Sequence, residues 1–135
     1  EQQGFADQLR PQLTYEGSSF HRVMKGFMVQ GGDLVSDRGL EQLSIFGHTY
    51  DAPEEVKKSV FDKPGLIGTA VSAPHLNGSQ FFIVTSPNGA PHLNGTCICF
   101  GKVSHGMDVV KDIENLPTKV SVPQEEVRIV ACGEL

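Results

Sequence analysis

The chain has 135 residues, which fits a single domain, and 39% of them are hydrophobic, enough for one core. Its formal net charge of −5 argues against nucleic acid as the main partner. No apolar run approaches the roughly 18 residues that a membrane-spanning helix needs, so no membrane span is expected.

Short segments rich in β-branched and aromatic residues, in which apolar and polar side chains alternate, predict a series of strands. Glycine and proline cluster between these segments, which is typical of turns between antiparallel strands. The expected strands cover residues 18–23, 27–30, 66–72, 79–85, 96–103 and 127–132.

One helix is expected late in the chain, over residues 107–116, because apolar residues recur there at helical spacing and Pro117 ends the pattern. Residues 54–61 predict one short helical turn inside the otherwise irregular segment 33–65. The polar residues 1–17 are expected to form a loop or the remnant of a helix. Many short strands with one late helix predict a mainly β fold, an antiparallel β-barrel.

Three cysteines, an odd and small number, do not suggest a disulfide framework. Cys97 and Cys99 lack the Cys-x-x-Cys spacing of a zinc site, and the five histidines show no metal-ligand spacing. No metal and no other cofactor is therefore expected. Buried free thiols favour a reducing compartment such as the cytosol, the nucleus or an organelle matrix.

A hexapeptide, Ala-Pro-His-Leu-Asn-Gly, occurs twice, at residues 73–78 and 90–95, each time before an expected strand. Pro and Asn-Gly are turn residues, so both copies predict loops at the same end of a sheet. The copies also create N-glycosylation sequons at Asn77 and Asn94, an alternative that the turn interpretation outweighs because no secretory signal is visible.

Two of the expected strand regions carry polar amides beside large apolar side chains, as the walls of a peptide-binding groove would. Residues two apart on a strand share a face. One face can therefore pack the core while the other presents a surface groove of Arg, Gln, Met and Phe. No nucleophile with a base and an orienting group stands out. The side chains expected to share faces are Phe20, Arg22 and Met24; Met28 and Gln30; and Gln80 and Phe82.

Several motifs together resemble the cyclophilin family of peptidyl-prolyl isomerases, over residues 15–135. The match is very specific because the motifs occur in one order along one short chain. They are Phe-His-Arg-Val at residues 20–23, Gly-Phe-Met-x-Gln-Gly-Gly-Asp at 26–33, Asn-Gly-Ser-Gln-Phe-Phe at 77–82, Phe-Gly-Lys-Val at 100–103 and Ala-Cys-Gly-Glu-Leu at 131–135.

The resemblance implies a role for each matching residue. Arg22 is similar to the family's catalytic arginine, and Gln30 to the residue that orders this arginine and the substrate backbone. Ala70 and Gln80 would line neighbouring subsites. The residues similar to the family's proline pocket are Phe27, Met28, Phe82 and Leu93.

The chain also departs from the family pattern inside the implied substrate site. Val71 stands where the family usually has Asn, and His92 where many members carry Trp, which by analogy weakens cyclosporin binding. Cys97 falls where the family has a pocket His, so the pocket floor becomes softer and less polar. Bulk at Leu40 and Glu41 is expected to narrow a second, non-proline pocket.

The resemblance further implies that residues 1–135 form one N-terminally incomplete domain, because the family barrel begins with two strands and a helix that have no counterpart here. We expect a longer natural chain, or a partner, to cover the sheet edge that this leaves.

The implied function is isomerisation of X-Pro bonds in peptides and proteins, with proline-containing peptides or proteins as partners. The alternative is a binding module, a weakly active or inactive cyclophilin-like subunit of a larger protein assembly. The substituted residues Val71, His92 and Cys97 motivate this alternative.

Overall fold

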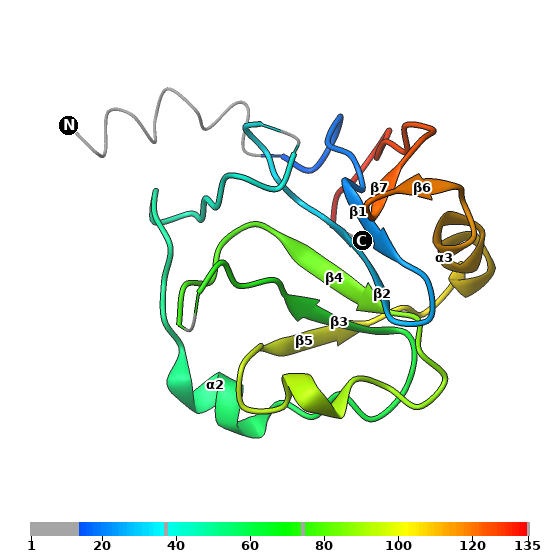
Figure 1. Ribbon diagram of the computed structural model, residues 1–135. Helices are drawn as coiled ribbons and strands as arrows, with labels where there is room; N and C mark the ends of the chain where they lie inside the picture. The colour runs from blue at the N-terminus through cyan, green and yellow to red at the C-terminus, as the bar shows by residue number, and fades with distance from the viewer. Residues whose placement is uncertain (1–13, 37, 74, 135) are drawn as a thin grey trace.

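A computed structural model of the chain describes residues 14–36, 38–73 and 75–134. Within these residues the fold is mainly β and antiparallel, as the sequence predicts, with two α-helices and one 3₁₀ helix (Figure 1). The expected loop or helix remnant at residues 1–17 lies outside the described residues except for positions 14–17, which form a bend and a turn. The strands are β1 (Arg22–Met24), β2 (Met28–Gly31), β3 (Leu66–Thr69), β4 (Phe81–Val84), β5 (Cys99–Lys102), β6 (Thr118–Lys119) and β7 (Val122–Pro123).

The main sheet has five strands in the order β1-β2-β4-β3-β5, and every neighbouring pair is antiparallel. A tight turn joins β1 to β2, with Phe27 N–H donating to the Met24 carbonyl at 2.9 Å. The register then places Gln30 of β2 directly opposite both Arg22 of β1 and Phe82 of β4. The central strands β2 and β4 therefore contribute side chains to both faces of the sheet.

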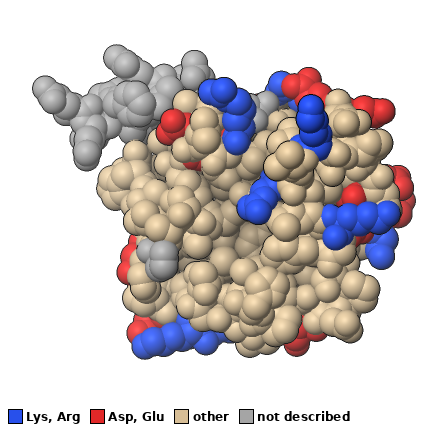
Figure 2. Space-filling model, viewed as in Figure 1, with Lys and Arg blue, Asp and Glu red and all other residues tan. Residues whose placement is uncertain are grey.

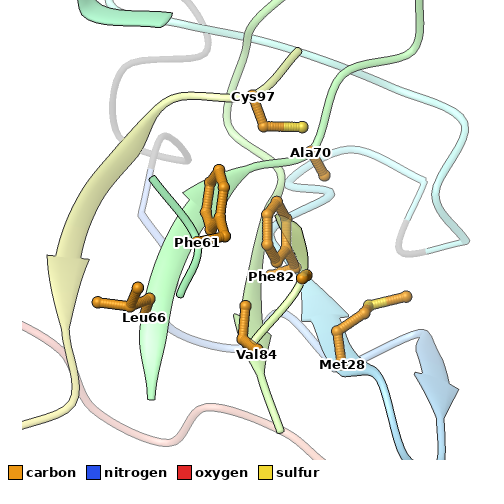
Figure 3. Close-up of a cluster of buried hydrophobic side chains, with 8 residues drawn as sticks. Met28, Phe61, Leu66, Ala70, Phe82, Val84 and Cys97 are labelled. Atoms are coloured by element: carbon orange, nitrogen blue, oxygen red, sulfur yellow. The ribbon is translucent and has the colours of Figure 1, made fainter. Parts of the chain in front are cut away.

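The two faces of this sheet bury separate apolar clusters, as the alternation of side chains on a strand requires. Met28, Phe82 and Val84 belong to the first cluster, which also includes Phe61 and is drawn in Figure 3. The second cluster lies against the helix α3 and contains Val23, Val29, Ile83 and Val110. Met28 and Phe82, which the family resemblance grouped in one pocket, thus lie together on the face away from α3.

The helices agree with the sequence patterns, although both end earlier than expected. α2 (Pro53–Lys58) has proline at its first turn, acidic residues near its N-terminus and lysines near its C-terminus, an arrangement that suits the helix dipole. It ends where Ser59 turns to extended backbone. α3 (Met107–Glu114) packs its apolar face on β1 and β2 (Figure 1). No helix in the described part of the chain is both long and apolar enough to cross a membrane.

The predicted strands differ from the structure in several places, and those over residues 66–72, 79–85 and 96–103 are shorter than predicted. The first strand begins at Arg22 rather than at residue 18, and Phe20 packs with the α3-side cluster, so it does not share a face with Arg22 and Met24. Residues 127–132 form no regular strand; they pair with residues 17–20 through three backbone hydrogen bonds and one isolated bridge between Ser19 and Arg128. The small hairpin of β6 and β7 was not expected, because its residues lack an alternating pattern.

The repeated hexapeptides lie at the same end of the sheet, as predicted. Phe81, at the start of β4, pairs with Thr69, and Cys99, at the start of β5, pairs with Gly68. Asn77 is fully buried, and its side chain bonds the Thr69 hydroxyl and the Tyr50 carbonyl. A buried amide cannot carry a glycan, so the first sequon is a structural turn. In the second copy, residues 91–93 form the 3₁₀ helix η2 (Pro91–Leu93).

Candidate active site

A pocket of about 210 Å³ opens on the face of the sheet away from α3, between β1, β2, β4 and the loop segments 70–71 and 93–97. In Figure 2 this side of the molecule is covered mainly by uncharged side chains, with a hollow near its centre. Nine of the eleven residues predicted from the sequence line the pocket, together with Thr96, which was not predicted. The ten lining residues are Arg22, Phe27, Met28, Gln30, Ala70, Val71, Phe82, Leu93, Thr96 and Cys97.

The floor of the pocket is apolar and firmly packed. Met28 and Phe82 are 3% and 4% exposed, and the Phe82 ring lies 5.4 Å from the ring of Phe61 (Figure 3). Gly68 makes this packing possible, because a Cβ atom there would lie only 2.6 Å from the Phe82 ring. The floor is therefore supported from beneath by a second aromatic ring, which is the arrangement of a preformed apolar site.

Arg22 stands at the edge of this apolar floor. Its side chain is exposed, and no hydrogen bond or ion pair joins it to any part of the chain that the structure describes. The surface salt bridge that would be the ordinary role of such an arginine is therefore not formed within residues 14–36, 38–73 and 75–134. The guanidinium group keeps all of its donors available to a molecule in the pocket.

Gln30 faces Arg22 across the β1–β2 pair and is held by the side chain of Gln80. The Gln30 Nε2 donates to Gln80 Oε1 at 3.0 Å, and Gln80 Nε2 donates to the Glu41 carbonyl at 2.8 Å. Gln80 itself is buried and does not line the pocket. The sequence predicted both glutamines near a substrate, and the structure links them to each other, with Gln30 facing the pocket and Gln80 behind it.

Of the three substituted residues that depart from the family pattern, Val71 and Cys97 line the pocket and His92 does not. Val71 and Cys97 line the pocket from the loop segments, and burial raises the pKa of the Cys97 thiol, an effect that a hydrogen bond with the Val71 backbone partly offsets. His92 lies outside the pocket, exposed on η2, with its ring 5.0 Å from that of Phe27. His92 therefore contacts Phe27, at the rim of the pocket, rather than Met28 and Phe82 on its floor.

The hydrogen bonds that residues 41 and 42 make behind the pocket were not predicted from the sequence. Gln42 bonds the backbone of both Ala70 and Gln80, and the Glu41 carbonyl completes the bonding of the Gln80 side chain. The only signal in the sequence was the departure from the family pattern at the neighbouring residues Leu40 and Glu41. That signal indicated added bulk, but it did not indicate a hydrogen-bonding role.

Of the eleven predicted residues, only Gln80 lines another of the hollows found among the described residues, together with Tyr50 and Phe100. An apolar hollow of about 450 Å³ is lined mainly by residues 43–46 with Tyr15, Leu34 and Tyr50. Among the residues that the structure describes, no group of three or more His, Cys, Asp or Glu side chains could hold a metal ion. The 210 Å³ pocket is where the sequence motifs, the unpaired arginine and an apolar floor coincide.

Comparison with known proteins points the same way as this geometry. Residues 3–134 match the family model described as cyclophilin type peptidyl-prolyl cis-trans isomerase/CLD. The chain is also 44% identical over 124 residues to the NK-tumor recognition protein of Mus musculus and, equally, to that of Homo sapiens. The matched region is 91% of this chain but only 8% of each relative.

Proposed function

Because the chain belongs to the cyclophilin-type peptidyl-prolyl cis-trans isomerase family, we propose that it catalyses cis-trans isomerisation of X-Pro bonds in peptides and proteins. The catalytic group is Arg22, acting electrostatically beside an apolar proline pocket. The observation that carries the proposal is the position of Arg22, whose guanidinium has no partner in the described residues and borders an apolar floor formed by Met28 and Phe82.

Such a site suits the reaction because isomerisation needs no covalent intermediate. Rotation about the amide bond has a barrier of roughly 18–20 kcal/mol, and uncatalysed exchange takes on the order of 10–100 s. Millisecond turnover therefore requires about four decades, or roughly 5–6 kcal/mol. One well-placed donor supplies about 3–4 kcal/mol. A guanidinium that donates toward the prolyl nitrogen localises its lone pair and weakens the double-bond character of the C–N bond.

The other residues of the pocket would bind the substrate. The proline ring would lie on the floor, where water is excluded, and this desolvation strengthens the effect of the neighbouring charge. Gln30, oriented by Gln80, would order Arg22 and accept or donate to the substrate backbone. Ala70 and Val71 would flank the residues next to proline. The residues proposed to hold the ring are Phe27, Met28, Phe82 and Leu93.

The proposal is tested by measuring isomerisation of a proline tetrapeptide by the whole chain and by the variant Arg22→Ala. We expect the variant to lose roughly 100-fold or more in kcat/KM. The matched control is Lys25→Ala, since Lys25 is an exposed cation in the turn beside Arg22 and does not line the pocket. The proposal fails if the unaltered chain shows no activity above the uncatalysed rate, or if both variants retain full activity.

A second candidate function is that of a proline-binding subunit of a larger protein assembly, with weak or absent catalysis. It is favoured by Val71, His92 and Cys97 and by the length of the relatives, of which the matched region is a small part. By analogy with the family, His92 in place of Trp would also weaken cyclosporin binding. This function predicts that proline peptides bind the unaltered chain while kcat/KM stays within about tenfold of the Arg22→Ala value. A chain that neither binds the peptide nor co-purifies with another protein would contradict it.

A further inference from the structure

The ladder between β3 and β4 is interrupted beside the pocket. The register of the two strands places Ala70 opposite Gln80, and Ala70 N–H donates to the Gln80 carbonyl at 3.0 Å. A hydrogen-bonded pair in an antiparallel sheet normally exchanges two such bonds. The reciprocal bond is replaced by a side chain: Gln80 N–H donates to Gln42 Oε1 at 3.0 Å, and Gln42 Nε2 donates to the Ala70 carbonyl.

The primary amide of Gln42 thus takes the place of a peptide group between the two strands. It satisfies one backbone donor and one backbone acceptor at once, and it holds the strands apart where they leave the sheet. Gly78 leaves room for it, because a Cβ atom there would lie 2.5 Å from Gln42 Oε1. The Gln42 side chain is therefore closely packed, with Gly78 on one side and the backbones of Ala70 and Gln80 on the other.

The loop that carries Gln42 is itself fixed by a buried carboxylate. Asp33 is 1% exposed, and its two oxygens accept hydrogen bonds from six backbone N–H groups of the loop that follows it. These groups belong to Val35, Ser36, Arg38, Gly39, Leu40 and Glu41. Gln42 follows immediately, so its side chain starts from an anchored backbone.

The bonds made by residues 41 and 42 converge on Gln80. Gln42 fixes its backbone N–H, the Glu41 carbonyl fixes its Nε2, and the remaining Oε1 accepts from Gln30. Gln30 faces Arg22 across β1 and β2. A shift of Gln80 would therefore be passed to Gln30 and so to the side of the pocket where the guanidinium stands.

We propose that Gln42 is a positioning residue of this site, which acts through Gln80 on the orientation of Gln30 opposite Arg22. The inference rests on the proposed isomerase function for its kinetic consequence but not for its structural one. Two variants separate the roles of its amide. Gln42→Met preserves length without either hydrogen bond, and Gln42→Glu preserves shape but, when ionised, places an acceptor against the Ala70 carbonyl.

The test uses the whole chain and combines two measurements. Amide NMR reports the Gln80 backbone N–H and the Gln30 side-chain amide, and a proline tetrapeptide reports kcat and KM. For Gln42→Met we expect faster exchange of the Gln80 amide proton, a shifted Gln30 amide signal and a fall of about tenfold in kcat/KM. The matched control is Gln124→Met, at an exposed glutamine that does not line this pocket.

A pH profile distinguishes positioning from a loss of folding. The introduced carboxyl in Gln42→Glu regains a donor when it is protonated, so activity should rise as pH falls, in a step that the unaltered chain and Gln42→Met lack. The inference is overturned if the Gln30 signal does not move in Gln42→Met, or if it moves while kcat/KM stays within twofold of the unaltered chain. If the unaltered chain is inactive, the proposed function fails, and the Gln30 signal and the dissociation constant for the peptide decide the inference instead.

Discussion

Arg22 and Gln30 face each other across the β1–β2 ladder, and only one of them is held in place by the described residues. Gln30 is fixed by its bond to Gln80, whereas the guanidinium of Arg22 has no partner there. Side chains that are directly opposite on antiparallel strands lie within contact of each other. A neutral amide at position 30 can therefore orient the arginine without neutralising it, which a carboxylate at the same position could not do.

The first prediction follows from this pairing. Gln30→Glu should form an ion pair with Arg22 worth about 1 kcal/mol, which lowers kcat/KM roughly fivefold by occupying the catalytic charge. High salt screens exposed pairs, so activity should recover partly as salt increases. The measurement is isomerisation of a proline tetrapeptide at low and high salt. Gln124→Glu adds the same charge at an exposed site and should match the unaltered chain; a salt-independent loss in Gln30→Glu would contradict the ion-pair explanation.

The second prediction concerns the support of the pocket floor. In Gly68→Ala the new methyl group would lie 2.6 Å from Phe82 and 2.7 Å from Phe61, so the rings must move. We expect a loss of about 1–3 kcal/mol in the free energy of unfolding, measured by urea denaturation, with weaker binding of proline peptides. Gly101→Ala is the matched control on β5, where the nearest atom to the new methyl is Ile67 Cδ1 at 3.9 Å. Equal stabilities of the two variants would show that the floor can relax.

The sequence predicted the central sheet well, because β2, β3, β4 and β5 have side chains sorted by face. Alternation is a local signal, and it persists wherever one face is buried. It failed at residues 18–21 and 127–132, which lie outside the main sheet and are joined by backbone hydrogen bonds and one isolated bridge. There Phe20 packs beside Phe81, with ring centroids 5.8 Å apart, and its face is set by that contact rather than by strand parity.

The site could be predicted from the sequence only through the family motifs. Arg22, Phe82 and Cys97 are far apart in the chain, and no local pattern indicates that they meet. The family resemblance located nine lining residues, within the motifs and between them, but it gave no information about Thr96 or Gln42. Those two lie in irregular loop segments, where no local pattern indicates which side chains meet, so their contacts follow only from the fold.

The third prediction uses the three thiols, which differ in exposure. Burial raises the pKa of both Cys97 and Cys99, so at neutral pH fewer of these thiols are ionised and available to react. Cys132 is exposed. A colorimetric thiol reagent at pH 7 should therefore give one fast equivalent, which Cys132→Ser removes, and slow reaction of the other two. A proline peptide should slow Cys97 further and leave Cys99 unchanged, and equal protection of both would argue against peptide binding over Cys97.

The last prediction concerns acid stability and Asp33. Burial by itself raises the pKa of this carboxyl, but hydrogen bonds from the Ser36 side chain and from the backbone of Val35, Ser36 and Glu41 outweigh that effect and hold the pKa well below its usual value. A carboxyl whose pKa is lower in the folded state stabilises the fold at pH above its unfolded value of about 3.9, and this contribution is lost as pH falls below that value.

Asp33→Asn should therefore remove about 2 kcal/mol at neutral pH, since hydrogen bonds to a charged acceptor are the stronger kind. The unaltered chain should lose stability as pH falls from about 4, and the variant should show a flatter profile over the same range. Urea denaturation at a series of pH values measures both. Asp108→Asn, at an exposed carboxyl in the first turn of α3, serves as the control and should keep the profile of the unaltered chain. Parallel profiles for the unaltered chain and Asp33→Asn would mean that the loop carrying Gln42 is held by other contacts than the ionised carboxylate.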